Sequence, residues 1–291
     1  MLRDAPDARD VDALCSFGVV NLDKPPGPSA HQISAWVRDL LGVERAAHAG
    51  TLDPKVTGCL PVLTGTATRL APALLEGDKE YVAVLELHAP APSDFVATLA
   101  EFEAPLYQKP PRKSAVARRR RVREIYALDL LELADDRRKA LLRVRCESGT
   151  YVRKLCHDVG LALGTGAHMG DLRRTAAGPF DDSDLVYLQD LSDGLAEWRE
   201  RGRDDWLRAV VRPAEVAVAH LPSVTIAESA ARSVAEGAPI FAPGVIEADD
   251  AETDALVACH TPNGALVCLG RLVGDPDAER GEVVSLERVL V

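Results

Sequence analysis

The stretch from His48 to Pro61 reads H-A-G-T-L-D-P-K-V-T-G-C-L-P and places one carboxylate, Asp53, between two glycines. Proline disfavours helical backbone for the residue before it, so Pro54 predicts an extended or turn conformation at Asp53. Gly50 and Gly58 interrupt regular structure on either side. The stretch is therefore predicted to be a fixed loop. It presents Asp53 either to a ligand or to neighbouring backbone N–H groups, as in an Asx turn.

Length and composition bound the class of protein. The chain has 291 residues with 47% hydrophobic content, which is enough for a sizeable core and about two domains. The uncharged run over 255–270 contains Thr-Pro-Asn-Gly and is too short to span a bilayer. The N-terminus is acidic where a signal peptide is basic, so we expect a cytoplasmic protein with no membrane association. Six cysteines form no C-x-x-C pair, which argues against zinc and fits reduced thiols.

The net charge of the chain is negative, which is the opposite of the sign expected for a nucleic-acid-binding protein. There are 45 acidic and 34 basic residues, a balance of −11, and 27 of the basic residues are arginine. Surplus surface acid keeps a protein hydrated at high salt, and this composition resembles that of proteins from salt-loving archaea. The arginines are clustered, so local patches can still attract phosphate.

Local patterns predict several elements in chain order. Residues 1–16 show no apolar periodicity and are expected to be a flexible lead-in. The segment F-G-V-V-N-L-D-K-P-P-G from residue 17 predicts a buried strand that ends at a proline-glycine turn. Helical spacing follows over His31–Leu41, and K-E-Y-V-A-V-L-E-L, which starts at Lys79, alternates as a strand does.

Several motifs together resemble one family. G-T-L-D-P followed by G-x-L-P is similar to the active-site motif of the TruB and dyskerin pseudouridine synthases, in which the aspartate is catalytic. The longer run D-P-K-V-T-G-C-L-P-V is more similar to the dyskerin branch, the catalytic subunit of H/ACA ribonucleoproteins. The resemblance covers roughly residues 17–291 and assigns the catalytic role to Asp53.

The same resemblance assigns supporting roles to other residues. Lys24, with Pro25, matches the motif that buttresses the catalytic loop, although a solvated turn lysine has the same local pattern. Tyr81 matches a tyrosine that stacks on the target base, and its alternative is a tyrosine packed in a sheet. G-T-Y-V-R-K-L places Arg153 as the ion-pair partner of Asp53, where it would orient the carboxylate and favour its ionised form.

Further roles follow from the last motif, M-G-D-L-R-R-T-A-A-G-P-F over 169–180. Leu172 takes the position of an apolar residue that lines the base pocket. Arg173 and Arg174 could reach phosphate, while Ala176 stands where an arginine is usual and puts one RNA contact in doubt. His48 matches a histidine that meets RNA in tRNA-type relatives, and its alternative is a plain loop histidine.

An arginine stripe lies in the run Y-Q-K-P-P-R-K-S-A-V-A-R-R-R-R-V-R-E-I-Y over 107–126. Its members are Arg118, Arg119, Arg120, Arg121 and Arg123. A charge run is often only a solvated face. Guanidinium groups in a row can also neutralise phosphates along an RNA backbone, and the resemblance to the dyskerin branch favours this interpretation.

The implied fold is α+β. A catalytic domain over 17–212 is built on a mixed, mainly antiparallel sheet, and residues 181–212 form a helical connector. From 220 to 291 the strand, helix and strand pattern, with a Pro-Asn-Gly hairpin, resembles a PUA RNA-binding barrel.

The implied reaction is isomerisation of uridine to pseudouridine in RNA, with no metal and no organic cofactor. The implied partners are H/ACA guide RNA, substrate RNA and the small accessory proteins of that particle, with rRNA and possibly tRNA as targets. Two alternatives remain open. One is a stand-alone tRNA pseudouridine synthase, and the other is a non-catalytic RNA-binding scaffold in which Asp53 is a turn residue.

Overall fold

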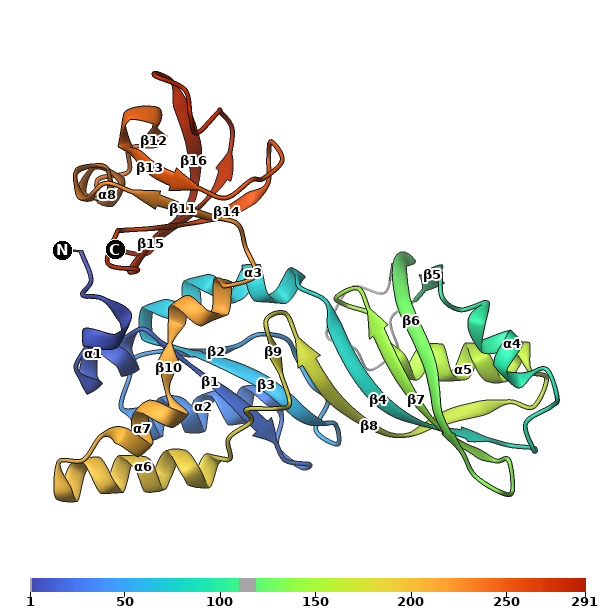
Figure 1. The fold of residues 1–291 in the computed structure, drawn as a ribbon. Coiled ribbons are helices and arrows are strands. Elements are labelled where there is room, and N and C mark those ends of the chain that lie inside the picture. The colour runs from blue at the N-terminus through green and yellow to red at the C-terminus, as the bar shows by residue number, and fades with distance from the viewer. Residues whose placement is uncertain (1, 110–118) are drawn as a thin grey trace.

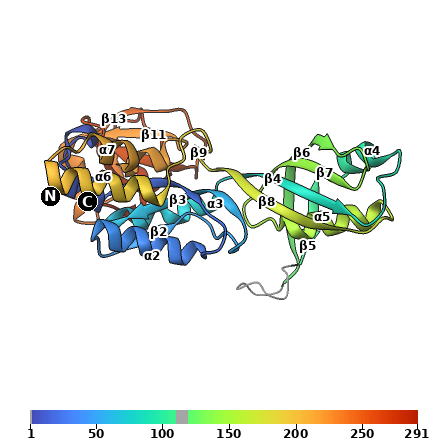
Figure 2. The ribbon, with the colours of Figure 1, turned by 90° about the horizontal axis from the view of Figure 1, so that it is seen from below.

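The computed structural model describes residues 2–109 and 119–291. Within them, one large sheet extends through two lobes of an elongated body, and a second, smaller sheet stands above one end (Figure 1). Seen from below, the lobes are joined through β4 (Lys79–Leu87) and β8 (Ala167–Ala177) (Figure 2). Among these residues no helix is long and apolar enough to cross a membrane.

The large sheet has ten strands in the described part of the chain, in the order β10-β1-β3-β8-β4-β7-β6-β5, with β2 and β9 added to β3 and β8. Within the described part of this sheet, β3–β8 is the one parallel pairing of strands, so the expected mixed, mainly antiparallel sheet is confirmed. Its remaining strands are β1 (Gly18–Lys24), β2 (Ala46–His48), β3 (Thr57–Thr64), β5 (Pro105–Gln108), β6 (Arg121–Leu133), β7 (Lys139–Cys146), β9 (Phe180–Asp181) and β10 (Arg212–Pro213).

Helices cover this sheet where the sequence alternates at helical spacing. The helix expected from His31 is α2 (Ala30–Leu41), which begins at a Ser29–Gln32 capping box and ends at Gly42 in the left-handed conformation. On β4 the side chains alternate between buried and half-buried. The remaining elements are α1 (Val11–Ser16), η2 (Gly65–Leu70), α3 (Ala71–Glu76), α4 (Phe95–Ala100), α5 (Val152–Ala162), α6 (Leu188–Arg201), α7 (Asp205–Val210) and η3 (Ala214–Val218).

The N-terminal segment differs from its prediction. Residues 1–16 were expected to be a flexible lead-in, but the chain forms η1 (Pro6–Ala8) and then α1. The Asp10 side chain caps α1 by accepting a hydrogen bond from the Ala13 N–H, and Val11 and Leu14 are buried. The prediction is wrong because Val11, Leu14 and Cys15 have helical spacing and are buried on one face of α1.

The smaller sheet follows the predicted order of elements. Its strands are β11 (Ser223–Ile226), β12 (Ile240–Phe241), β13 (Val245–Ala248), β14 (Leu256–His260), β15 (Leu266–Leu272) and β16 (Glu282–Val289), with α8 (Glu228–Ala235) and η4 (Ala242–Gly244) between them. The expected hairpin at Pro-Asn-Gly is present, since the Thr261 N–H donates to the Ala265 carbonyl across it at 3.0 Å.

The smaller sheet packs directly on the large one. Leu266 and Leu290 lie in the same apolar cluster as Leu63, Leu70 and Val218 of the larger body. The N-terminal segment ties the two parts together as well, because an Arg3 guanidinium nitrogen donates to the Leu290 carbonyl at 2.5 Å. The relative position of the two sheets is therefore fixed by buried contacts, not by a linker alone.

Candidate active site

The backbone of the Asp53 loop is held by a buried lysine. Lys24, at the end of β1, is fully buried and donates to the carbonyls of Pro54 at 3.0 Å and Val56 at 2.8 Å. The Gly27 N–H also donates to the Pro54 carbonyl at 2.8 Å. Burial lowers the pKa of Lys24, and the negative charge of Asp53 opposes that shift. Lys24 thus makes the predicted contacts with the loop, and the alternative of a solvated turn lysine is wrong.

The Asp53 side chain points out of the loop toward Arg153, in the first turn of α5, and the two form an ion pair. In the described part of the chain no backbone N–H donates to this carboxylate, so the Asx-turn alternative is not observed. The side chains are 56% and 50% exposed, and a pair this exposed contributes only about 0–1 kcal/mol. Such a pair is stronger where water is excluded from it, because the local dielectric constant is then lower.

A residue that the sequence did not single out positions Arg153. Gln108, at the end of β5, is buried, and its Oε1 accepts from the Tyr151 N–H at 2.8 Å. Its Nε2 donates to the Tyr151 carbonyl at 3.3 Å. Tyr151 is the N-cap residue of α5, so these two bonds fix the point where the helix begins. A lone glutamine carries no local signal of such a role.

Tyr81 and Leu172 lie on neighbouring strands of one sheet. Tyr81 of β4 stands opposite Arg174 of β8, and Leu172 stands opposite Ala83. Tyr81 is largely buried, and burial raises the pKa of its hydroxyl, while the positive charge of Arg174 opposes that shift. Leu172 packs against the core at its edge. The structure thus brings both residues to one part of the sheet.

The two adjacent arginines of β8 have different surroundings. Arg174 is 1% exposed and donates to the Cys59 carbonyl, so the expectation that it reaches phosphate is wrong. Arg173 forms a two-pronged pair with Asp23, with both nitrogen–oxygen distances at 2.9 Å. This pairing raises the pKa of Arg173 and offsets its charge. Its contact with phosphate stays a prediction.

Comparisons with known proteins match these motifs. A model described as TruB family pseudouridylate synthase (N terminal domain) matches residues 38–152, and one described as tRNA pseudouridylate synthase B C-terminal domain matches 153–219. A PUA domain model matches 222–290, and a DKCLD (NUC011) domain model matches 4–34. The chain belongs to the TruB family of pseudouridine synthases.

Similar proteins align with this synthase over all or nearly all of its sequence. A probable tRNA pseudouridine synthase B from Halobacterium salinarum is 64% identical over 100% of the chain and 99% of the relative. The counterpart from Pyrococcus abyssi is 44% identical over 98% of the chain and 87% of the relative.

Solved structures of complexes match the fold as well. The crystal structure of a Cbf5-Nop10-Gar1 complex contains a chain with a TM-score of 0.92 and 43% identity, covering 100% of this synthase and 90% of that chain. A structure of an H/ACA RNP bound to a substrate RNA containing 2′-deoxyuridine gives 0.91 and 41%, with coverage of 100% and 90%.

His48 of this synthase lies at the end of the short strand β2, not in the loop. Its Nε2 lies 3.3 Å from the Nδ1 of His31 on α2. Burial, together with the nearby charges of His31 and Arg174, lowers the pKa of His48 to about 4. His48 is therefore neutral near pH 7, and any contact with RNA there would be one of shape or hydrogen bonding. That contact stays a prediction.

The arginine stripe is only partly available for phosphate. Arg118 lies outside the described residues. Arg119 and Arg120 are exposed, and Arg121 is the first residue of β6. Arg123 donates to Glu147 at 2.9 Å, so its charge is already compensated. Of the stripe that the structure describes, Arg119 and Arg120 are the most accessible positive charges.

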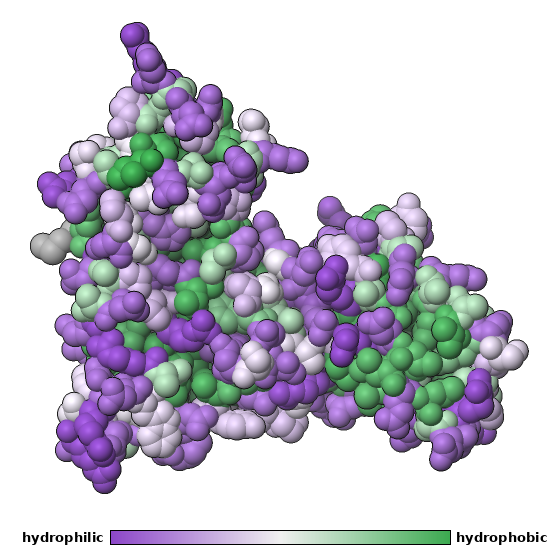
Figure 3. Space-filling view, in the orientation of Figure 1, coloured by the Kyte–Doolittle hydropathy of each residue, from purple (hydrophilic) through white to green (hydrophobic). Residues whose placement is uncertain are grey.

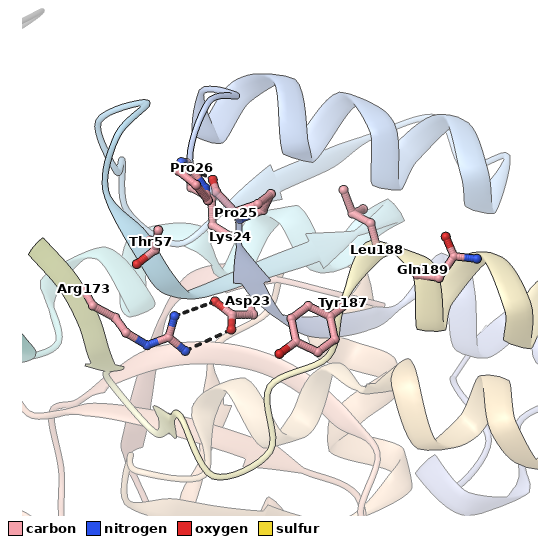
Figure 4. Close-up of a pocket in the computed structure, with 9 residues that line it drawn as sticks. All are labelled: Asp23, Lys24, Pro25, Pro26, Thr57, Arg173, Tyr187, Leu188 and Gln189. Carbon is pink, nitrogen blue, oxygen red and sulfur yellow. Dashed lines mark hydrogen bonds and ion pairs between the residues drawn. The ribbon is translucent and has the colours of Figure 1, made fainter.

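A pocket of about 410 Å³ opens beside the loop, between β1, β8 and the start of α6. Lys24 and Thr57, which border it, also flank the Asp53 loop. In Figure 4 the Arg173–Asp23 ion pair lines this pocket, and Arg173 and the Tyr187 ring lie on opposite sides of Asp23. Its lining residues are Asp23, Lys24, Pro25, Pro26, Thr57, Arg173, Tyr187, Leu188 and Gln189.

Proposed function

We propose that Asp53 is the catalytic residue of this pseudouridine synthase and that guide RNA selects its target uridines, as in an H/ACA particle. The observation that supports the catalytic assignment is the Asp53–Arg153 ion pair. A charged partner fixes the carboxylate and favours its ionised form. A wide separation of Asp53 and Arg153 would have supported the scaffold alternative, in which Asp53 is only a turn residue, and the ion pair removes that support.

The reaction balances without an external oxidant or reductant. The target uridine leaves its stack and enters the site, where Tyr81 and Leu172 contact the base. With Asp53 acting on the nucleotide, the bond from C1′ to N1 breaks, the uracil turns, and a bond from C1′ to C5 forms. The proton lost from C5 is matched by a proton gained at N1. We therefore propose that neither a metal nor an organic cofactor takes part.

Guide-directed action is supported by similarity to chains solved in Cbf5-Nop10-Gar1 and substrate-bound H/ACA structures. The accessory proteins named there are the partners we propose, together with guide RNA and rRNA. Space-filling Figure 3 shows hydrophobic side chains gathered over the region of β4, β7 and β8, on an otherwise mostly hydrophilic face. An exposed apolar area of this kind often marks an interaction surface.

Activity on tRNA without a guide is the second candidate, because the curated relatives carry the name tRNA pseudouridine synthase B. We also propose a cytoplasmic location. All six cysteines are free and buried, as expected in a reducing compartment.

Asp53→Asn tests the catalytic assignment. The amide keeps the size of the side chain but is a far poorer base or nucleophile, and it loses the charge-assisted bond to Arg153. We expect wild-type folding and RNA affinity with pseudouridine below detection. Asp39→Asn is the matched control, because Asp39 also pairs with an arginine, Arg38, on the surface of α2. Normal yield from Asp53→Asn would rule out Asp53 as the catalyst.

Reconstitution separates the two RNA classes. The wild-type chain is incubated with rRNA and tRNA fragments, with and without guide RNA and accessory proteins, and the modified positions are mapped. Guide-dependent modification of rRNA supports the proposal. Modification of tRNA by the protein alone, with no effect of guide RNA on rRNA, would favour the second candidate.

A further inference from the structure

One buried guanidinium group holds both ends of the loop that carries Asp53. The Nε of Arg174 donates to the Cys59 carbonyl at 2.7 Å, and its Nη2 donates to the Gly50 carbonyl at 3.2 Å. Gly50 precedes Asp53 in the chain and Cys59 follows it. The loop is therefore closed at its base by a single side chain that belongs to a different strand, β8.

The glycines of the loop fit closely around this arginine. Gly50 has a φ of +120°, and a Cβ there would lie 3.2 Å from Arg174 Nη1. Gly58 has a φ of +98°, and a Cβ there would lie 2.2 Å from the Arg174 carbonyl oxygen. Both backbone conformations strongly favour glycine. The two glycines that frame Asp53 in the sequence thus let the loop approach Arg174.

Arg174 also contacts the residue expected to stack on the base. The two residues are register partners on the neighbouring strands β4 and β8, and the positive charge of Arg174 acts on the Tyr81 hydroxyl, where it opposes the rise in pKa that burial causes. Among the described residues no carboxylate forms an ion pair with Arg174, although the side chain is 1% exposed. Burying a charge without a counter-charge is costly, so its bonds to two carbonyls have to stabilise it. An apolar side chain would fill the space without that cost.

We propose that Arg174 is a positioning residue that sets the distance between the Asp53 loop and Tyr81. This inference rests on the proposed function, in which Asp53 acts on a base held against Tyr81. The hydrogen bonds of Arg174 connect the loop to β8. Replacing Arg174 therefore moves the Asp53 carboxylate relative to the bound base. A displacement of this kind lowers the rate of reaction and leaves RNA affinity nearly unchanged.

The test compares three variants in single-turnover pseudouridine formation at saturating RNA, with the RNA dissociation constant measured separately. Arg174→Met removes all donors, and Arg174→Lys keeps the charge and one donor group. Arg137→Met is the matched control, because Arg137 also donates to two backbone carbonyls, those of Ala91 and Pro92. We expect a rate about 100-fold lower for Arg174→Met, about 10-fold lower for Arg174→Lys and unchanged for Arg137→Met.

The results that overturn the inference are distinct. An unchanged rate in Arg174→Met removes the positioning role, and a loss confined to RNA affinity, with the rate at saturating RNA unchanged, contradicts it as well. If Arg174→Met does not fold, Gly50→Ala provides the second test. It leaves Arg174 in place but strains the loop at one of its two anchor points. A rate close to that of the wild type in Gly50→Ala would contradict the inference.

Asp53→Asn, assayed in parallel, separates the two proposals. If Asp53→Asn makes pseudouridine, the proposed catalytic assignment fails whatever Arg174 does. If Asp53→Asn is inactive while Arg174→Met reacts at the wild-type rate, only the positioning role of Arg174 fails.

Discussion

Glu215→Ala should separate the unfolding of the two domains. Glu215 lies in η3, between the domains, and its Oε1 accepts from Arg9 at 2.6 Å and from the Leu266 N–H of β15 at 3.1 Å. Its Oε2 accepts from Arg9 at 2.9 Å. The Arg9 and Glu215 side chains are 1% and 12% exposed, so this carboxylate joins the N-terminal segment, the catalytic domain and the PUA domain in a nearly dry environment.

The magnitude follows from what Glu215→Ala leaves behind. Removing one partner of a buried ion pair costs about 3–5 kcal/mol, because the other charge remains buried. The Leu266 N–H also loses its acceptor, which adds about 1–3 kcal/mol if water cannot replace it. These contributions overlap and do not simply add. Against a total stability of about 5–15 kcal/mol, we expect a loss of at least about 3 kcal/mol.

Urea denaturation followed by two probes measures this loss. The three tryptophans, at positions 36, 198 and 206, all lie before the PUA domain, so their fluorescence reports the catalytic domain alone. Far-UV circular dichroism reports both domains. The wild type should show coincident transitions, and Glu215→Ala should show separate ones.

A double replacement supplies the control. Arg9→Met combined with Glu215→Leu removes both charges and restores apolar volume, so it should be more stable than Glu215→Ala alone. Coincident transitions in Glu215→Ala, with a loss below about 1 kcal/mol, would refute the assignment of this pair as the joint between the domains.

Two further predictions concern pH and salt. His48 has a pKa of about 4 when folded and an ordinary value of 6.5, so the unfolded chain binds more protons between those values and stability falls as pH decreases through that window. The melting temperature of His48→Gln should therefore fall less than that of the wild type when the pH is lowered from 7 to 5. An equal fall in both proteins would contradict a buried, neutral His48. Replacing Arg119 and Arg120 by alanine should weaken binding to all RNAs alike and reduce the slope of log affinity against log salt by up to about 2. An unchanged slope would make them a solvated surface.

The sequence predicted the elements whose signal is local. The run K-E-Y-V-A-V-L-E-L predicted β4 at Lys79–Leu87, and buried and half-buried side chains alternate along it, as they do on a half-buried strand. The loop around Asp53 followed from Pro54 and its two glycines. The ion pair with Arg153 was predicted only through family resemblance, because nothing in the local sequence of either residue indicates that they meet.

The roles of Arg174 and Gln108 in the site depend on contacts with segments that are distant in sequence. Arg173 and Arg174 were given one role because they are adjacent, yet successive side chains on a strand point to opposite faces. That alternation alone indicates that one of the two turns inward, and β8 shows it to be Arg174. Gln108 had no such signal, since its two bonds are to the backbone of Tyr151.

The loop is positioned by cations that do not bind its carboxylate. Lys24 from β1 and Arg174 from β8 are both buried, and the bonds they make to the loop are to backbone carbonyls. Among the described residues, Arg153 alone forms an ion pair with Asp53, and that pair is half exposed. Mobile ions screen exposed charges strongly and buried contacts weakly. In a chain with a net charge of −11, whose composition fits a high-salt interior, loop geometry therefore depends little on salt. The RNA affinity that we propose for the exposed arginines would depend on salt directly.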